Sequence, residues 1–401
     1  MSDQPYVNLL DPQFYVDPWD AYRWLRDEAP VFKDPVQGLW AVSRYEDILA
    51  VEKNGHLYSS FAGSRPLQDQ RADRSMINQD DPDHQTQRNI VSREFTPRAV
   101  RDHEDHVRQV VTEILDDVIE RGECDAVEEI AARLPATMIT ELLGYPPEFW
   151  PRVRDWAAQI MYLSGQTHAE GPLLDLPPTL METYQDWAMA TIPLIEARRA
   201  EPKGDLISKW VQQEGWDNTR VLEETILVLN GGAETTRAVI GSMIRELALQ
   251  PDQRRVLHDH PELLQTIAIE EFIRWVSPVL NMRRTVTEDH EFHGQELREG
   301  DELLLLYPSA NRDPRAFDHP DVLDVTRPDN RHLGFGFGTH FCLGAHLARL
   351  EIRVMFEELL RRIPEWDLVD PGEPQIAAAT FARAYDRIRI SFTPGPREAA
   401  A

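Results

Sequence analysis

The chain of 401 residues has few cysteines, few basic residues and no long apolar segment. Two cysteines, Cys124 and Cys342, are too few to build a disulfide framework in a chain of this length. Lys and Arg number 42 against 69 Asp and Glu residues, so the formal net charge is −27. Nucleic-acid binding depends on neutralising phosphates, and we therefore expect no nucleic-acid partner for a chain this acidic.

The longest apolar runs, such as Leu303–Tyr307, are far shorter than the roughly 20 apolar residues of a membrane-spanning helix. The N-terminal residues Met1–Pro5 are mostly polar and lack the apolar core of a signal peptide. We therefore expect no membrane insertion and a cytoplasmic location. Gly- and Ser-rich linkers and internal repeats are missing as well, which favours one domain over residues 1–401.

Helical periodicity dominates the chain. The spacing of apolar residues predicts helices over Pro18–Glu28, Arg98–Glu120, Val127–Leu143, Thr179–Ala200, Arg220–Leu249, Pro261–Val276 and Leu343–Ile363. Strand-like segments are shorter: Val31–Lys33, Leu39–Val42, Arg284–Val286, His290–Phe292, Leu303–Tyr307 and Arg387–Phe392. They do not alternate with helices as in a nucleotide-binding α/β fold. The sequence predicts a mainly α protein, β-richer near the N-terminus and at residues 284–307 and 387–392.

A glycine-rich segment precedes Cys342 directly before a predicted helix. Gly334, Gly336 and Gly338 indicate a tight loop, because glycine adopts backbone conformations that other residues avoid. A thiolate at a helix N-terminus faces unpaired N–H groups and the positive end of the helix dipole, and both lower its pKa. Gly344 leaves room for a flat macrocycle against the backbone. Taken alone, Cys342 could equally be a buried structural cysteine, which is our interpretation of Cys124.

The predicted helix Arg220–Leu249 contains two adjacent glycines within Asn230-Gly231-Gly232-Ala233-Glu234-Thr235-Thr236. Each glycine inside a helix costs about 0.8–1 kcal/mol relative to alanine, and close approach of a ligand is the usual compensation. The hydroxyl of Thr235 can donate to the carbonyl of Gly231, and we expect this contact to open the helix locally. A flexible helix with an ordinary acidic face is the alternative.

Residues Phe335 to Gly344 read Phe-Gly-x-Gly-x-His-x-Cys-x-Gly. This string resembles the haem-binding signature of the cytochromes P-450 at every fixed position, and the similarity extends over nearly the whole chain. The chain looks like a soluble bacterial member of that family. The resemblance implies a triangular prism of helices with small β-sheets, and haem b between the long central helix and the Cys342 loop. It makes Cys342 the iron ligand, with Phe335, Gly336, Gly344 and Gly231 against the haem.

The resemblance also gives roles to two further motifs. The Gly-Gly-x-acid-Thr motif places Glu234 and Thr235 as the catalytic pair that delivers protons during oxygen activation. Relatives that use peroxide typically lack this pair, so dioxygen and two electrons are the expected co-substrates. Glu271 and Arg274 match the family's Glu-x-x-Arg element, a structural charge cluster whose third member we assign to Arg327.

Haem propionates need cationic or hydrogen-bonding partners. The resemblance supplies them from three segments: His84 and Arg88, Arg284 after the Glu-x-x-Arg helix, and His340 in the haem loop. Arg283 beside Arg284 leaves an ambiguity of one residue. For each of these residues alone, an ordinary surface position is the alternative.

We expect a monomeric monooxygenase that hydroxylates an apolar small molecule with dioxygen and two electrons. By position, Leu227, Gly231 and Leu280 should line the substrate pocket, and Asn230 should be its polar group. The loop Phe61–Ile77 and the stretch Leu163–Leu180 are expected to form its roof. Segments around the haem look most similar to bacterial members that oxidise sterol side chains, which favours a steroid over a terpenoid, a fatty acid or a small aromatic.

Electrons are expected from an NAD(P)H-dependent ferredoxin reductase through a small acidic ferredoxin on the Cys342 side. A basic patch for this partner is predicted from seven arginines: Arg88, Arg93, Arg98, Arg101, Arg108, Arg349 and Arg353. Two other functions remain open. A haem-thiolate sensor or electron carrier would need Cys342 but neither Glu234 nor Thr235, and an enzyme that rearranges an oxygenated substrate would need no external electrons.

Overall fold

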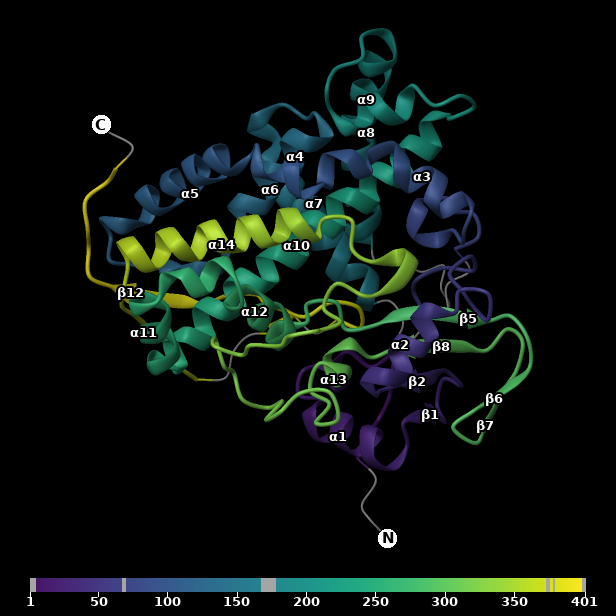
Figure 1. Ribbon diagram of the computed structural model, residues 1–401. Coiled ribbons are helices and arrows are strands. Elements are labelled where there is room, and N and C mark those ends of the chain that lie inside the picture. Colours follow the sequence, from purple (N-terminus) through teal and green to yellow (C-terminus); the bar gives the residue numbers. More distant parts are fainter. Residues whose placement is uncertain (1–4, 67–69, 167–177, 373–375, 378, 399–401) are drawn as a thin grey trace.

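The structure, a computed structural model, describes residues 5–66, 70–166, 178–372, 376–377 and 379–398 (Figure 1). Helices form most of it: α1 (Trp19–Glu28), α2 (Tyr45–Lys53), α3 (Asp83–Val91), α4 (Pro97–Arg101), α5 (Glu104–Ile119), α6 (Arg133–Leu143), α7 (Trp150–Gln166), α8 (Pro178–Ala200), α9 (Leu206–Val211), α10 (Asn218–Leu249), α11 (Pro251–Asp259), α12 (Ala268–Val276), α13 (Tyr307–Ala310) and α14 (Ala345–Arg362). Among the described helices, none has the length and apolar composition of a membrane span.

The strands are short and lie in four small sheets. They are β1 (Val31–Lys33), β2 (Trp40–Val42), β3 (Tyr58–Ser59), β4 (Glu123–Asp125), β5 (Met282–Val286), β6 (His290–Phe292), β7 (Gln295–Leu297), β8 (Glu302–Leu305), β9 (Trp366–Leu368), β10 (Ile376–Ala377), β11 (Ala384–Tyr385) and β12 (Arg389–Phe392). The largest sheet has the order β1-β2-β8-β5-β3, and only its β2–β8 pair is parallel. The β4-β12-β9 sheet joins a segment near residue 124 to the C-terminal part of the chain.

Helix α10 is the centre of the fold and packs against α6, α7, α12 and α14 (Figure 1). The carboxylate of Asp217 caps it by accepting the N–H of Arg220 at 2.9 Å. The C-terminal half buries Val239, Ile240, Met243 and Ile244 in the main hydrophobic core. Because α10 is buried on several sides, its neighbours fix the direction of each of its side chains.

The predicted elements are largely confirmed, and the differences have local causes. The predicted helix Arg98–Glu120 is two helices, α4 and α5, which meet at Asp102 and His103. The predicted helix Val127–Leu143 begins as a π-helical turn, Ala126–Ala131, and α6 starts only at Arg133. Pro135 lies in the first turn of α6, where its missing N–H leaves no hydrogen bond unmade.

Two more predicted helices start later than the pattern suggested. The segment Pro261–Gln265 is a 3₁₀ turn, and α12 follows from Ala268. The helix after Cys342 begins at Ala345 rather than at residue 343. The helices α2, α3, α7, α9, α11 and α13 are not among the predicted ones, since their short or mixed segments show weaker periodicity.

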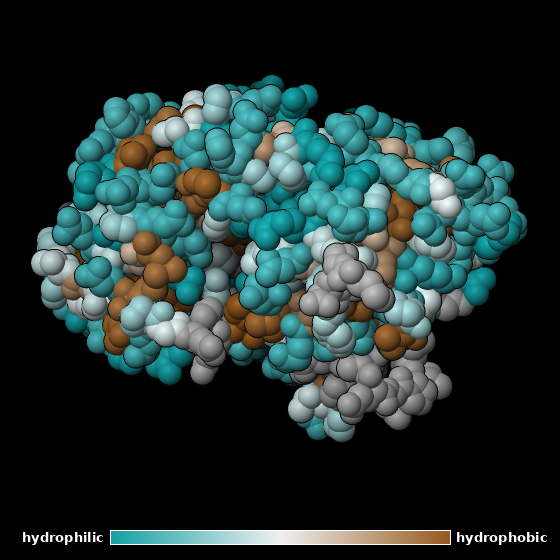
Figure 2. Space-filling model, turned by 90° about the horizontal axis from the view of Figure 1, so that it is seen from below, coloured by the Kyte–Doolittle hydropathy of each residue, from teal (hydrophilic) through white to brown (hydrophobic). Residues whose placement is uncertain are grey.

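The surface follows the acidic composition. The face in Figure 2, seen from below the view of Figure 1, is mostly hydrophilic, with separate apolar patches between polar side chains. Some large apolar side chains are exposed elsewhere in the described chain, and two of them, Phe337 and Phe341, belong to the Cys342 loop.

Candidate active site

A cavity lies between α10 and the segment that runs from Gly334 into α14. It encloses about 1490 Å³ of space, part of it open to solvent. Its walls include eleven of the predicted site residues: His84, Arg88, Leu227, Gly231, Thr235, Arg284, Phe335, Gly336, His340, Cys342 and Gly344.

The Cys342 loop is held tightly on both sides. The N–H of Cys342 donates to the carbonyl of Phe335 at 2.9 Å, which closes the loop on itself. Gly336 and Gly338 have φ of 66° and 69°, a region that side chains rarely adopt. A Cβ at Gly338 would lie 2.6 Å from the backbone oxygen of Glu52 in α2. Both positions therefore require glycine, as the tight-loop prediction implied.

The protonation of Cys342 differs from the prediction. Burial raises the pKa of the Cys342 thiol, and the N–H of Gly344 and the charges of Arg88 and Arg349 oppose this only in part. The helix starts two residues too late for its terminal N–H groups to dominate. The predicted lowering of this pKa is therefore wrong for the polypeptide alone. A bound metal ion deprotonates a coordinating thiol, so a ligand role does not need a low intrinsic pKa.

The two adjacent glycines of α10 have different structural reasons. A Cβ at Gly231 would meet open cavity space, whereas a Cβ at Gly232 would lie 2.2 Å from the side chain of Ile139 in α6. The hydroxyl of Thr235 donates to the carbonyl of Gly231 at 2.7 Å, as the sequence predicted. The expected local opening of the helix is absent, since α10 is a continuous α-helix throughout Asn218–Leu249.

Glu234 lies off the cavity wall, although Thr235 lies on it. The Glu234 carboxylate is buried at 2% exposure and accepts two hydrogen bonds from Arg237, at 2.7 and 2.9 Å. Arg237 also reaches the hydroxyl of Tyr162 at 3.4 Å. A carboxylate held in this way can exchange protons with the cavity only through a rearrangement of the side chain or through water.

Basic and histidine side chains gather at one end of the cavity. The rings of His84 and His340 lie 4.3 Å apart, and Arg88 and Arg284 line the same walls. Burial lowers the pKa of His340 to about 2, with further lowering by Arg284, His84 and Arg88. Burial also lowers the pKa of His84, against the hydrogen bond to Asp81. Near neutral pH this end therefore carries two arginine charges and two neutral imidazoles.

The β5 strand separates the two neighbouring arginines. Successive residues of a strand point to opposite faces. Arg284 faces the cavity, whereas Arg283 donates to the carbonyl of Arg65 at 3.0 Å and pairs with Glu302 at 3.2 Å. This geometry favours Arg284 over Arg283 as a partner for an anionic group in the cavity.

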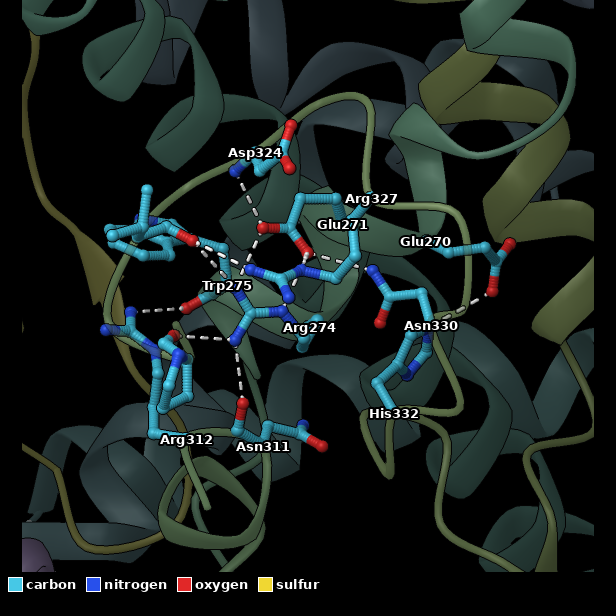
Figure 3. A network of polar contacts seen from close by, with 12 residues as sticks. Glu270, Glu271, Arg274, Trp275, Asn311, Arg312, Asp324, Arg327, Asn330 and His332 are labelled. Atoms are coloured by element: carbon cyan, nitrogen blue, oxygen red, sulfur yellow. Dashed lines mark hydrogen bonds and ion pairs between the residues drawn. The ribbon is translucent and has the colours of Figure 1, made fainter. Parts of the chain in front are cut away.

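The three predicted members of the charge cluster, Glu271, Arg274 and Arg327, meet in one polar network (Figure 3). The guanidinium of Arg274 donates twice to Glu271 at 2.7 Å, and Arg327 donates to the same carboxylate at 3.0 Å. Asn330 and the N–H of Asp324 complete its coordination at 2.8 and 2.9 Å. A buried carboxylate needs this many partners. The cluster fixes α12 to the chain that leads into the Cys342 loop, which is a structural role.

The predicted basic patch is only partly present. Three of its arginines are paired with acidic side chains: Arg108 with Glu357 and Glu358, Arg349 with Glu270, and Arg353 with Glu104. Arg88 faces the cavity. The prediction of a seven-arginine patch is therefore wrong. Arg93, Arg98 and Arg101 are exposed, and none of them forms an ion pair within the described part of the chain.

Two predicted pocket residues lie elsewhere. Leu280 is buried in a separate cluster with the N-terminal segment, and its neighbour Val279 lines the cavity instead, because adjacent extended residues face opposite ways. Asn230 is also off the wall, about 100° around the helix from Gly231. Its side-chain oxygen is buried without a hydrogen bond among the described residues. The absence of Asn230 from the wall removes the one polar group that was predicted for the substrate pocket.

Several wall residues were missed at the sequence level. On α10 they continue the stripe of Leu227 and Gly231 at helical spacing, and a count from Thr235 would have found them: Val228, Gly232, Thr236 and Val239. Met76 and Ile77 line the cavity from the predicted roof loop Phe61–Ile77. Most of the other predicted roof stretch falls in residues 167–177, outside the described residues. Pro278 and Met282 had no recognisable signal.

The residues present fit a haem. The cavity offers one half-buried thiol, positions without side chains at Gly231 and Gly344, apolar walls and a cationic end for propionates. A flat macrocycle would fill the open space beside Gly231 and Gly344. Iron held by a cysteine thiolate is the ligation that favours cleavage of dioxygen.

Comparison with known proteins agrees with this geometry. The sequence model of the cytochrome P-450 family matches residues 194–376. The chain is 39% identical over 400 residues to a steroid C26-monooxygenase of Mycolicibacterium smegmatis, covering 98% of both chains. It is 40% identical over 404 residues to a steroid C26-monooxygenase of Mycobacterium tuberculosis, covering 99% of both.

The fold agrees with solved structures along the whole chain. CYP109E1 of Bacillus megaterium in complex with testosterone has a TM-score of 0.86 at 30% identity, over 95% of this chain and 99% of that one. Cytochrome P-450 CYP268A2 of Mycobacterium marinum, in complex with pseudoionone, has a TM-score of 0.87 at 31% identity, over 98% and 100%. The predicted fold class is confirmed. The chain belongs to the cytochrome P-450 family, and it is a haem-iron monooxygenase of the bacterial type.

Proposed function

We propose that this enzyme hydroxylates a steroid or the side chain of a sterol, with haem b as its cofactor. The observation that carries the proposal is the identity of about 40%, along almost the entire length, to two enzymes named steroid C26-monooxygenase. The apolar cavity supports it, since its walls beyond the thiolate end are mainly aliphatic. The enzyme acts as a cytoplasmic monomer and a single domain of residues 1–401.

Thiolate-ligated haem iron supplies the activation of dioxygen and the insertion of one oxygen atom into a C–H bond. Cys342 would hold the iron, and Gly231 and Gly344 would leave space on the two sides of the macrocycle. Leu227, Val228 and Val279 would press the substrate into position and keep water away from it. The protein therefore contributes binding, orientation and exclusion of water.

Thr235 and Glu234 would control the protons. The Thr235 hydroxyl lies on the cavity wall while it donates to Gly231, so its oxygen can accept a hydrogen bond from a water and relay a proton. Glu234 would release Arg237 and carry protons from the interior behind α10. A sensor or electron carrier would need neither the hydroxyl at this wall nor a cavity for a second occupant.

Steroids should displace water from the ferric iron and shift its spin state, because an apolar molecule in this cavity leaves no space for the water. We expect the shift in absorbance titrations of the purified enzyme with cholest-4-en-3-one, progesterone and testosterone at micromolar concentration. Pseudoionone and a fatty acid serve as comparison ligands. A shift with either of these and with none of the steroids would refute the steroid assignment and leave the monooxygenase function in place.

Arg284 would bind a haem propionate together with His84, Arg88 and His340. Arg284→Ala should therefore weaken haem retention during purification. The rate of haem dissociation should rise by about tenfold or more, because a charge-assisted hydrogen bond is lost. Arg283→Ala removes an equal charge one residue away and should leave haem retention close to that of the unchanged enzyme. The ratio of haem to protein absorbance measures both, and the reverse ranking would move the role to Arg283.

Electrons would arrive from an NAD(P)H-dependent reductase through a small acidic ferredoxin. Arg98 and Arg101 lie in α4 and Arg93 lies just before it, and α4 packs against α14, the helix that follows Cys342. They are the exposed remainder of the predicted basic patch on an otherwise acidic protein. Their position suits a negatively charged donor that must approach the iron from the Cys342 side.

Charge reversal at this surface should slow reduction by an acidic ferredoxin. The double variant Arg98→Glu and Arg101→Glu should lower the second-order reduction rate by about tenfold at low ionic strength, with the difference shrinking as salt is added. Arg23→Glu on α1 is the matched control and should have no effect. Stopped-flow reduction in carbon monoxide measures the rates. Equal rates for the double variant and the control would show that these arginines do not guide the donor.

A further inference from the structure

A carboxylic acid lies at the cationic end of the cavity and has no part in the chemistry above. Glu52, near the end of α2, is 7% exposed and lines the cavity beside Gly336. Its Oε1 accepts a hydrogen bond from the hydroxyl of Tyr307 at 2.7 Å and lies 3.7 Å from the guanidinium of Arg284. Its Oε2 is buried and has no hydrogen bond partner in the described part of the chain. A buried carboxyl oxygen in this position needs a partner that the occupant of the cavity would supply.

The charges at this end leave no room for another anion. Arg88 and Arg284 are the only lysine or arginine side chains that the described residues place on this cavity wall. A haem brings two propionates, which balance the two arginines. An ionised Glu52 would be a third carboxylate against two cations in a site with little water, and adjacent carboxylates in such a site share a proton.

We infer that Glu52 is a haem-positioning residue that keeps its proton and donates a hydrogen bond to one haem propionate. The inference rests on the proposed placement of the propionates at Arg284 and His340. It gives Oε2 the partner it lacks, since a protonated carboxyl donates through one oxygen and still accepts through the other. Tyr307 then holds the acid in place through Oε1.

The groups around Glu52 agree with a neutral acid. Burial raises the pKa of Glu52, and the charge of Arg284, the hydroxyl of Tyr307 and the backbone N–H of Phe337 oppose this only in part. Burial raises the pKa of Tyr307 well above its usual value, so this phenol stays protonated. On the loop side His340 lines the same cavity, and on α2 the next residue, Lys53, is exposed with its ammonium over the ring of Phe337.

Haem transfer from the holoenzyme to excess apomyoglobin tests the inference. The haem contact exists while Glu52 is protonated and is lost as pH rises through its raised pKa. The transfer rate of the unchanged enzyme should therefore increase by about tenfold or more as pH is raised from the acidic to the alkaline limit at which the holoenzyme stays folded. Glu52→Gln keeps a donor that does not titrate, so its rate should stay flat over this range. Glu52→Asp keeps a titratable acid and should retain the pH dependence.

Controls separate this role from the placement of the propionates. Glu46→Gln changes an exposed acid on the same helix and should behave like the unchanged enzyme. Arg284→Ala should speed haem transfer at every pH, and no effect there would overturn the propionate placement and the inference together. A normal Arg284→Ala effect combined with an unchanged pH profile in Glu52→Gln would overturn the role of Glu52 alone. Circular dichroism shows whether each variant is folded. If Glu52→Gln does not fold, Glu52→Asp becomes the informative variant. A haem-transfer rate of Glu52→Asp that does not depend on pH would then contradict the role of Glu52.

Discussion

Replacing Cys342 with serine should abolish the strongly red-shifted Soret band of the ferrous carbonyl complex and reduce monooxygenase activity to background. A serine hydroxyl is far less acidic than a thiol and donates less electron density to iron, so it cannot reproduce thiolate ligation. The loop itself should survive, because its closing hydrogen bond uses the backbone N–H of residue 342 and the glycines remain. The difference spectrum of the reduced, carbonyl-bound protein is the measurement.

Cys124 cannot substitute for the missing thiol. It lies in β4, paired opposite Ile390 of β12, and it is not on the cavity wall among the described residues. Burial raises the pKa of Cys124 to about 12, so it stays a thiol near neutral pH. Cys124→Ser is therefore the matched control and should keep the band. A Cys342→Ser protein that retained the red-shifted band would contradict the ligand assignment and return attention to Cys124.

The features that sequence reasoning located best are those written in a short stretch of chain. The Cys342 loop depends on glycines with positive φ at fixed distances from one cysteine. This backbone requirement is visible in the sequence as the spacing of the glycines. The bond from Thr235 to Gly231 joins neighbours on one turn of helix, so the spacing alone predicts it. The pair of Glu271 and Arg274 is local in the same way, although its partner Arg327 was found only through the family resemblance.

The errors concern quantities that the whole fold decides. The pKa of Cys342 depends on burial by several elements, and the position of Cys342 near a helix start says nothing about that burial. The arginine patch was miscounted because Arg108 is neutralised by acids about 250 positions later in the chain. Leu280 and Val279 are equally apolar, and only the packing of the N-terminal segment on one face of the strand decides which one meets the cavity.

The adjacent glycines Gly231 and Gly232 are required for two different structural reasons, which the sequence does not distinguish. The pair Gly231 and Gly232 suggested a single explanation, the approach of a ligand. In the structure both glycines line the cavity, but a Cβ at Gly231 would meet open space, whereas a Cβ at Gly232 would clash with Ile139 of α6. Helix propensity shows that a glycine destabilises the helix, and only the neighbouring residues show why glycine is needed at that position. A variant Gly232→Ala should therefore damage packing against α6 rather than ligand binding.

Thr235→Ala should uncouple electron consumption from product formation. The enzyme is expected to oxidise reduced cofactor through its partners at a rate near normal, while most of the electrons appear as hydrogen peroxide. The reason is that the Thr235 hydroxyl is the polar group of α10 placed on the wall between Gly231 and Thr236, where a relayed proton would enter. Product and peroxide measured per NAD(P)H consumed give the coupling. Thr225→Ala is the matched control, because Thr225 makes the same bond to a carbonyl four residues earlier but lies off the cavity wall.

Glu234→Gln should slow product formation by about 10²–10⁴-fold, as expected for the loss of a positioned proton donor. The amide keeps the size of the side chain and can still accept a hydrogen bond from Arg237, so the packing behind α10 should be preserved. Arg237→Gln should instead keep the Glu234 carboxylate but remove the hydrogen bonds that now hold it to Arg237. Proton delivery through Glu234 also predicts a solvent isotope effect on turnover that changes in Glu234→Gln. Unchanged turnover, coupling and isotope effect in Glu234→Gln would show that protons reach Thr235 by another route.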